Sequence, residues 1–129
     1  MVVGAPRPFW WTSDWPEGTD QGANTINWTF GGFPVAVRLV SIHAFSVVPN
    51  TVGTYTLALT NNGTAASMLA GATFNMNTLV ANTWAALAVT GTEADLRLAL
   101  LGRATLALAS DNAGFDGSGI FIAALFEET

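Results

Sequence analysis

Apolar and polar side chains alternate at every second position through most of this chain. In the clearest run, 54–60, Tyr55, Leu57 and Leu59 alternate with threonine and alanine. The run 104–109 follows the same pattern, with leucine on one side of the strand. A period of two residues is typical of a β-strand that buries one face. The alternation therefore restricts the chain to folds in which strands cover a core with one side each.

The longest run, 35–48, changes its apolar side in the middle. Val35, Val37 and Leu39 share one side, whereas Val40 and Ile42 are apolar on the other. A one-residue shift moves every following side chain to the opposite face of a sheet. The sequence therefore predicts either a β-bulge near Val40 or a strand that passes from one sheet to another.

The remaining segments are shorter, and two of them stay open. Trp84 is expected to anchor the core from the strand that contains it. Residues 65–70 fit either a helical turn or a loop, and residues 93–101 fit a helix by propensity and a strand by alternation. The further strands expected are 24–30, 73–80, 83–89 and a buried strand at 120–126.

These segments amount to about eight strands separated by short turns that contain glycine and asparagine. Such turns are typical of antiparallel sandwiches and barrels. We therefore expect an all-β fold, an antiparallel jelly-roll-like β-sandwich, formed by residues 24–129.

Residues 1–23 have a different composition and are expected to form an extended N-terminal arm. They hold the aromatic residues Phe9, Trp10, Trp11 and Trp15 and also Pro6, Pro8 and Pro16. Proline disfavours helix and interior strand. Because exposed aromatic side chains favour association, we expect the arm to dock on its own sandwich or on a neighbouring subunit. The four aromatic residues are the candidate interface residues, and a sugar-stacking platform is the alternative for the tryptophans.

The charge content excludes several classes of partner. Charged residues make up 10% of the chain, there is no lysine, and the formal net charge is −5. Nucleic-acid binding requires a basic face that neutralises phosphates, and binding to an anionic membrane requires basic residues as well. No apolar run approaches the roughly 18 residues of a membrane-spanning helix. We therefore expect neither a nucleic-acid partner nor a membrane partner.

The low charge also has a positive implication. An ordinary soluble domain carries about 25% charged residues, and a small domain exposes a large share of its surface. The surface here must either be covered by small polar residues or be buried against other subunits. The sequence thus favours a subunit of an assembly, and a threonine- and asparagine-rich β-protein that tolerates low charge is the alternative.

No group of residues predicts catalysis. There is no cysteine, and His43 is the single histidine, so a zinc site or a catalytic triad lacks its usual residues. Asp111 and Asp116 share one loop, and Glu93 and Asp95 share another. Paired carboxylates occur in glycoside hydrolases, but turns also favour aspartate. We expect no catalytic, cofactor-binding or metal-ligating residues and a chain that is not an enzyme.

The loop 111–117 has oxygen-bearing side chains at positions that resemble a calcium-binding loop. The closing glutamate is missing, since Ile122 stands twelfth from Asp111. A polar turn before the last strand accounts for the same residues without an ion.

The order of several segments between residues 34 and 127 carries a family resemblance. A long early strand (35–42, VAVRLVSI) precedes a strand that begins at a glycine (53–59, GTYTLAL) and an Asn-Gly turn. A late block (101–108, LGRATLAL), the loop Gly117-Ser118-Gly119 and an apolar final strand follow. In this order the region resembles small jelly-roll structural proteins of tailed-bacteriophage virions. One departure is Arg103, where such proteins often have an acidic residue.

The resemblance implies a non-enzymatic virion structural protein without a cofactor. The family includes capsid decoration (cement) proteins, which are commonly trimers on the outer capsid lattice and bridge neighbouring capsid subunits. The resemblance thus implies a homotrimer on the capsid exterior, with the major capsid protein or other virion subunits as partners. The alternative is a head or tail fibre module, or a module that binds host-surface carbohydrate.

Overall fold

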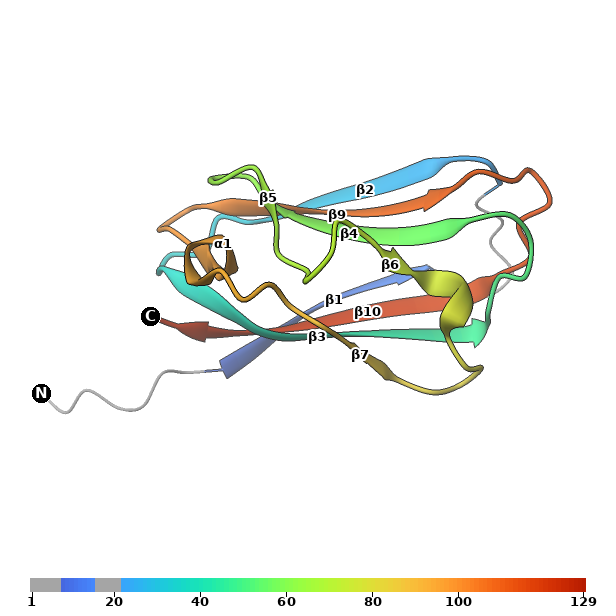
Figure 1. The fold of residues 1–129 in the computed structure, drawn as a ribbon. Helices are drawn as coiled ribbons and strands as arrows, with labels where there is room; N and C mark the ends of the chain where they lie inside the picture. The colour runs from blue at the N-terminus through green and yellow to red at the C-terminus, as the bar shows by residue number, and fades with distance from the viewer. Residues whose placement is uncertain (1–7, 16–21) are drawn as a thin grey trace, which may run out of the picture.

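The computed structural model describes the backbone of residues 8–15 and the whole of residues 22–129. The described residues form two antiparallel sheets packed face to face (Figure 1). Sheet A contains β1 (Pro8–Trp15), β10 (Ser118–Glu128), β3 (Val37–Val48), β7 (Ala85–Leu87) and β8 (Arg97–Leu98). Sheet B contains β2 (Thr25–Gly31), β9 (Arg103–Ser110), β4 (Tyr55–Asn61), β5 (Ala66–Ser67) and β6 (Phe74–Asn75). Two short helices, η1 (Met76–Thr78) and α1 (Glu93–Leu96), lie in the connections.

The strands pair in a nested order. β1 pairs with β10, β2 with β9, β3 with β7 and β8, and β4 with β5 and β6. β10 and β9 also pair with β3 and β4, which completes the two sheets. At one edge of each sheet, two short strands pair with the same long strand: β7 and β8 with β3, and β5 and β6 with β4. Each sheet is therefore four strands wide. The expected all-β fold, an antiparallel β-sandwich, is confirmed.

The core lies between the inner faces of the two sheets. On β4 the predicted inward residues Tyr55, Leu57 and Leu59 are all buried, and Leu106 and Leu108 on β9 are buried opposite them in the register. Each fully buried leucine contributes about 1.5–3 kcal/mol relative to an exposed one. The alternation in the sequence therefore identifies the core of sheet B correctly.

The change of side in the long third strand is a β-bulge. In the pairing of β3 with β10, Phe126 is opposite Leu39 and Leu125 is opposite Ser41, so Val40 has no partner on β10. Leu39 and Ile42 are consequently both buried, although their positions differ in parity. The bulge predicted at Val40 is confirmed, and β3 stays in sheet A along its whole length.

The two segments left open combine several short elements. Residues 93–101 begin as helix α1, continue as strand β8 and end in a turn, so helix and strand are both correct in part. Residues 65–70 contain the two-residue strand β5. In place of the strand expected at 73–80, the structure has the two-residue strand β6 followed by η1. In place of the strand expected at 83–89, it has the three residues of β7.

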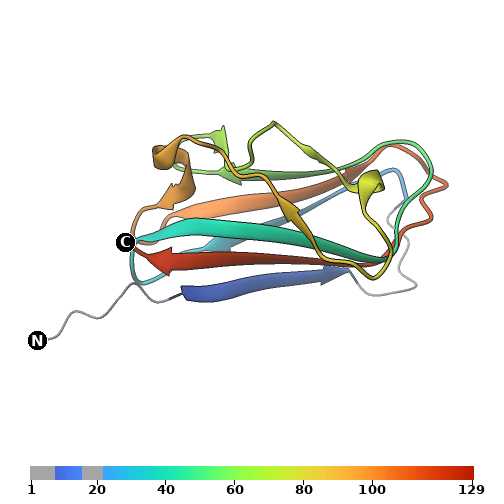
Figure 2. The same cartoon turned by 60° about the horizontal axis from the view of Figure 1, so that its bottom comes forward.

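Two expectations about burial are corrected. Trp84 does not anchor the core, because 50% of its side chain is exposed. It lies just before β7 and packs on Phe45 with ring centroids 5.1 Å apart. The final strand β10 is fully buried on one face only: Ile120, Ile122 and alternate residues after them face the core, and those between are half-buried. Figure 2 shows β10 between β1 and β3.

Candidate interaction surfaces

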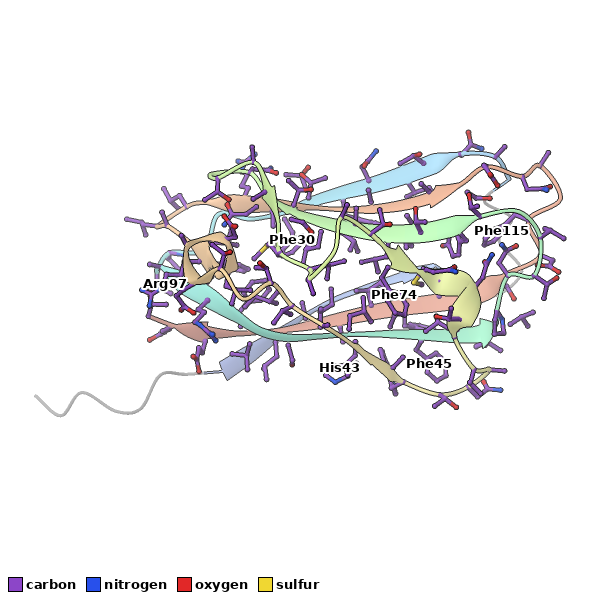
Figure 3. All side chains as sticks on the ribbon, viewed as in Figure 1. Phe30, His43, Phe45, Phe74, Arg97 and Phe115 are labelled. Atoms are coloured by element: carbon purple, nitrogen blue, oxygen red, sulfur yellow. The ribbon has the colours of Figure 1, made fainter. Side chains whose placement is uncertain are left out.

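The charged side chains of residues 22–129 lie at the two ends of the sandwich. Arg38 is the second residue of β3 and is paired in register with Glu127 and Arg97. Figure 3 shows Arg97 at this end and Phe115 at the other. The end that holds α1 carries Arg38, Glu93, Asp95, Arg97, Arg103, Glu127 and Glu128, and the opposite end carries Asp111 and Asp116. The strand surfaces between the two ends carry no charged side chain within residues 22–129.

The charges near α1 form one small network. The Arg38 Nε lies 2.6 Å from Glu93 Oε1, and the Arg97 Nε lies 3.2 Å from the same oxygen. The hydrogen bond from Arg38 lowers the pKa of Glu93, and Arg97 lowers it further. All three side chains are substantially exposed, and exposed ion pairs contribute little to stability. Glu93 is therefore held by two guanidinium groups.

Beyond Arg103, the exposed first residue of β9, the outer face of sheet B carries only small uncharged side chains on its three long strands. Each outward residue of β9 after Arg103 is opposite one residue of β2 and one of β4. The resulting rows are Thr25–Ala109–Thr56, Asn27–Ala107–Ala58 and Thr29–Thr105–Thr60. We call these nine residues the Thr/Ala face.

Hydroxyl groups order one row of the Thr/Ala face. Thr105 Oγ1 donates to Asn62 Oδ1 at 3.1 Å, so the Thr29 hydroxyl, 3.2 Å from Thr105 Oγ1, donates to it. Alanine loses no rotamer freedom on burial, whereas long charged side chains lose up to about 2 kcal/mol each. Covering this face with another protein surface therefore carries a small entropic cost.

The outer face of sheet A carries a cluster of aromatic rings. Phe45 on β3 contacts Trp84 and also Phe121 on β10, with a centroid distance of 5.8 Å to Phe121. His43 lies on the same strand face, is half-buried and is opposite Ala86 and Ala123. In Figure 3 His43 and Phe45 point away from sheet B. The histidine therefore lies on the outer face of β3 beside the aromatic cluster.

Apolar side chains are also exposed at the end of the sandwich near α1. Leu100 and Leu101, in the turn between β8 and β9, are 61% and 62% exposed. The backbone of Leu101 is left-handed, with φ of 62°, and its N–H donates to the Phe33 carbonyl at 3.0 Å. Phe33 lines a hollow of about 250 Å³ together with Pro34, Val35 and Glu128. Exposed apolar residues that gather in this way are typical of contact surfaces.

The turn at Leu100 and Leu101 was missed by the sequence analysis, which included both residues in a helix or strand. The signal that could have identified it is Gly102, directly after the two leucines. Glycine often follows the residue at which a regular element ends.

The acidic loop 111–117 is braced against the segment before β4. Asp111 Oδ1 accepts a hydrogen bond from the Thr54 N–H at 2.7 Å, and Asp116 Oδ1 accepts one from the Thr51 N–H at 2.6 Å. The Thr51 hydroxyl also binds Asp116. These hydrogen bonds lower the pKa of both aspartates. The loop thus matches the polar-turn interpretation, and both carboxylates are engaged by backbone amides.

Within residues 22–129, no three histidine or acidic side chains gather in a way that could hold a metal ion. No helix in the described part of the chain is long and apolar enough to cross a membrane.

The candidate interface residues of the arm fall within β1, whose backbone lies along β10. Trp10 is opposite Leu125, which is half-buried. The register places the others opposite buried residues: Phe9 opposite Phe126, Trp11 opposite Ala124 and Trp15 opposite Ile120. Residues 8–15 therefore form the edge strand of sheet A, while residues 1–7 and 16–21 of the predicted arm lie outside the described residues.

Comparison with known proteins gives one likeness. No protein-family model and no curated protein matches the chain. Among solved structures, the chain is similar to a chain in one described as "Cyanophage Pam1 capsid asymmetric unit", with 15% sequence identity and a TM-score of 0.55. The likeness covers 100% of this chain and 92% of that one. At this level of identity, what the two chains share is the fold, over essentially their whole lengths.

Proposed function

We propose that this chain is a non-enzymatic structural protein of a bacteriophage virion and that it decorates the outer capsid lattice. The observation that carries the proposal is the likeness in fold to a chain of a cyanophage capsid structure. That likeness covers 100% of this chain and 92% of that one, so the proposal rests on the whole fold and not on a part of it.

The distribution of charge supports a role in contacts between subunits. The Thr/Ala face and the aromatic cluster of Phe45, Trp84 and Phe121 on the outer face of sheet A contain no charged side chain. Burying a charged side chain is costly unless it is paired, so uncharged faces suit contact with other subunits. Small side chains on the Thr/Ala face further reduce the entropic cost of association.

The position on the capsid exterior and the partner are part of the same proposal. The net charge of −5 suits a surface that does not contact packaged DNA. We propose the major capsid protein as the partner and a homotrimer as the unit that binds it. Many copies on a lattice gain avidity from weak single contacts.

The direct test uses particles of the virus whose genome encodes the chain. Mass spectrometry of purified particles should detect the chain, and antibodies against it should label intact particles on the outside. Particles stripped of the chain should bind the purified protein again at saturable sites. Absence of the chain from purified particles would overturn the proposal, and labelling of the tail alone would favour a fibre module.

The interface role of Phe9, Trp10, Trp11 and Trp15 stays a prediction. Single alanine variants of the four residues separate two roles when attachment to particles and thermal stability are both measured. Replacing an interface residue should weaken attachment and leave the melting temperature unchanged. Replacing a residue that stabilises the sandwich should instead lower the melting temperature. If all four variants have a lower melting temperature but still attach to particles once folded, the interface does not lie in this strand.

A carbohydrate-binding module is the second candidate, because Trp84 is half-exposed beside Phe45. Aromatic rings of this kind present a flat apolar surface for stacking. Binding on a glycan array that is lost in Trp84→Ala would favour this candidate. An array without signal would argue against it.

A further inference from the structure

We propose that the open edge of β2 pairs with β2 of a second copy of the chain, so that sheet B continues from one subunit into the other. This inference goes beyond the proposed function and does not depend on it. It rests on the direction of the backbone groups of β2, on the composition of this edge and on its register with itself.

The backbone hydrogen bonds at both ends of β2 show which of its groups face outward. The Ser110 N–H donates to the Asn24 carbonyl, and the Gly32 N–H donates to the Gly102 carbonyl, both at 2.9 Å. In an antiparallel pair, such hydrogen-bonded positions recur at every second residue. The even-numbered residues of β2 therefore bond to β9, and the N–H and C=O groups of Thr25, Asn27 and Thr29 point away from it.

The described part of the chain supplies no strand for these outward groups. β2 is at the end of the order β2–β9–β4–β5 and lies at the margin of its sheet in Figure 1. A row of alternating free donors and acceptors in extended backbone is complementary to another extended strand. The partner that these backbone groups fit is therefore another β-strand.

The edge of β2 also lacks the features by which proteins prevent such pairing. Exposed edges are usually protected by charged residues, proline, bulges or very short strands. β2 has seven residues, TINWTFG, with neither charge nor proline, and its pairing with β9 contains no irregularity. The other sheet edges are protected: β1 contains Pro8 and Asp14, and the opposite edges consist of strands of two or three residues.

The sequence of β2 fits its own antiparallel copy. Pairing the outward groups over the whole strand places Trp28 opposite Trp28 of the second copy. Asn27 then faces Thr29 of the second copy, and Ile26 faces Phe30 of it. Polar residues thus meet polar residues on the outer face, and apolar residues meet on the side of the core. A two-fold axis through Trp28 satisfies all of these contacts at once.

Trp28 and Ile26 have apolar surface left for such a contact. Both are only half-buried within the single chain, although Trp28 packs against the core cluster. A tryptophan pair across the axis would cover part of this surface, and aromatic pairs contribute more than their buried area alone. Since β2 carries no charge, two copies approach here without like-charge repulsion along the strand. A second copy is therefore the occupant that this edge fits best.

Removing one outward N–H tests the pairing without disturbing the bonds to β9. In Asn27→Pro the lost N–H is one that points away from β9, and proline is tolerated on edge strands. Asn27→Ala is the matched control because it keeps the N–H. Light scattering behind a sizing column should show an even-numbered assembly for the wild type and for Asn27→Ala. Asn27→Pro should have half that mass, whether the wild type is a dimer or a pair of trimers.

Disulfide cross-linking tests the register and remains informative if Asn27→Pro fails to fold. The chain has no cysteine of its own. In a hydrogen-bonded antiparallel pair the Cα atoms are about 5.5 Å apart, which lies within the range of disulfides. The double variant Asn27→Cys/Thr29→Cys should therefore form a covalent dimer on mild oxidation, and each single variant should not.

The outcomes separate this inference from the proposed function, since all of these measurements use the purified chain. A monomeric wild type, or a three-chain assembly that Asn27→Pro leaves unchanged, would overturn the pairing of β2. So would a double-cysteine variant that stays uncross-linked. Neither result bears on whether the chain is found in virions, which the particle experiment decides separately.

Discussion

The side-chain amide of Asn61 donates a hydrogen bond to the main-chain carbonyl of Arg97 at 2.7 Å. The same Nδ2 donates to the Asp95 carbonyl at 3.0 Å, and Oδ1 accepts from the Gly63 N–H at 2.8 Å. Asn61 is 1% exposed at the end of β4. One buried side chain therefore joins the turn after β4 to the segment in which α1 becomes β8, although the two are distant in the sequence.

Replacing the single side chain of Asn61 should destabilise the fold strongly. Asn61→Ala removes the partner of two part-buried carbonyls and of two N–H groups, and an unsatisfied buried polar group costs about 1–3 kcal/mol. We expect a loss of about 2–3 kcal/mol in the free energy of unfolding, measured by urea denaturation. The control Asn62→Ala, at an exposed position in the same turn, should lose under about 1 kcal/mol. Equal losses for the two variants would contradict this role.

Gly31 at the end of β2 should not accept a side chain. Its φ is 118°, and a Cβ atom there would lie 2.5 Å from the Gly102 carbonyl oxygen. Backbone strain of this kind costs about 1–3 kcal/mol, and the clash adds to it. Gly31→Ala should therefore lower the unfolding free energy by about 2 kcal/mol or more, whereas Gly91→Ala, which has open space around it, should leave it nearly unchanged. Thermal unfolding of both variants provides the comparison.

Asp116 should make stability depend on pH in the acidic range. The hydrogen bonds from Thr51 lower the pKa of Asp116 in the folded chain, relative to about 3.9 in an unfolded chain. A lowered folded pKa contributes stability above the unfolded value, and this contribution is lost as the pH falls through the folded value. Asp116→Asn should thus be less stable than the wild type at pH 7 and approach it in stability below about pH 3.

The control for this experiment is Glu128→Gln, which removes one negative charge at the other end of the sandwich. Its difference from the wild type measures the loss of one carboxylate that does not accept the hydrogen bonds from Thr51. Parallel curves of unfolding free energy against pH for wild type and Asp116→Asn would refute the effect of Thr51.

A charge in the middle of the Thr/Ala face should block contact with other subunits. Ala107 lies in the central row on the central strand β9. Ala107→Glu changes a half-buried residue on the outer face, so the fold should persist, while burying an unpaired carboxylate against a partner is costly. We expect attachment to particles to fall at least tenfold. Ala72→Glu, in an exposed loop, should attach like the wild type.

The alternation of side chains predicts the long strands well because each is long enough to display its period. β4 and β9 follow it without interruption, and the single disturbance in β3 corresponds to the bulge at Val40. A period of two cannot be recognised in a strand of two or three residues. The alternation therefore predicts the segment between residues 65 and 98 poorly. The core strand expected to contain Trp84 is represented only by the short strand β7.

The interaction surfaces were harder to predict than the fold. The low charge content indicated buried surface, but its location depends on register, which brings Thr25, Ala109 and Thr56 into one row. The open edge of β2 also depends on the strand order, since the same seven residues in the middle of a sheet would have no free backbone groups. Local sequence patterns carry no information on such neighbours.

The pairing of β1 with β10 determines when folding can finish. Pro8 is opposite Glu127, so the first described strand and the last one lie side by side. Chains rich in such distant contacts fold slowly, and synthesis supplies the N-terminal residues first. During translation β1 therefore has no partner until residues 120–127 have left the ribosome. The pairing of β1 is thus a late step in the formation of sheet A, and its rate sets how long the edge of β10 stays open to other chains.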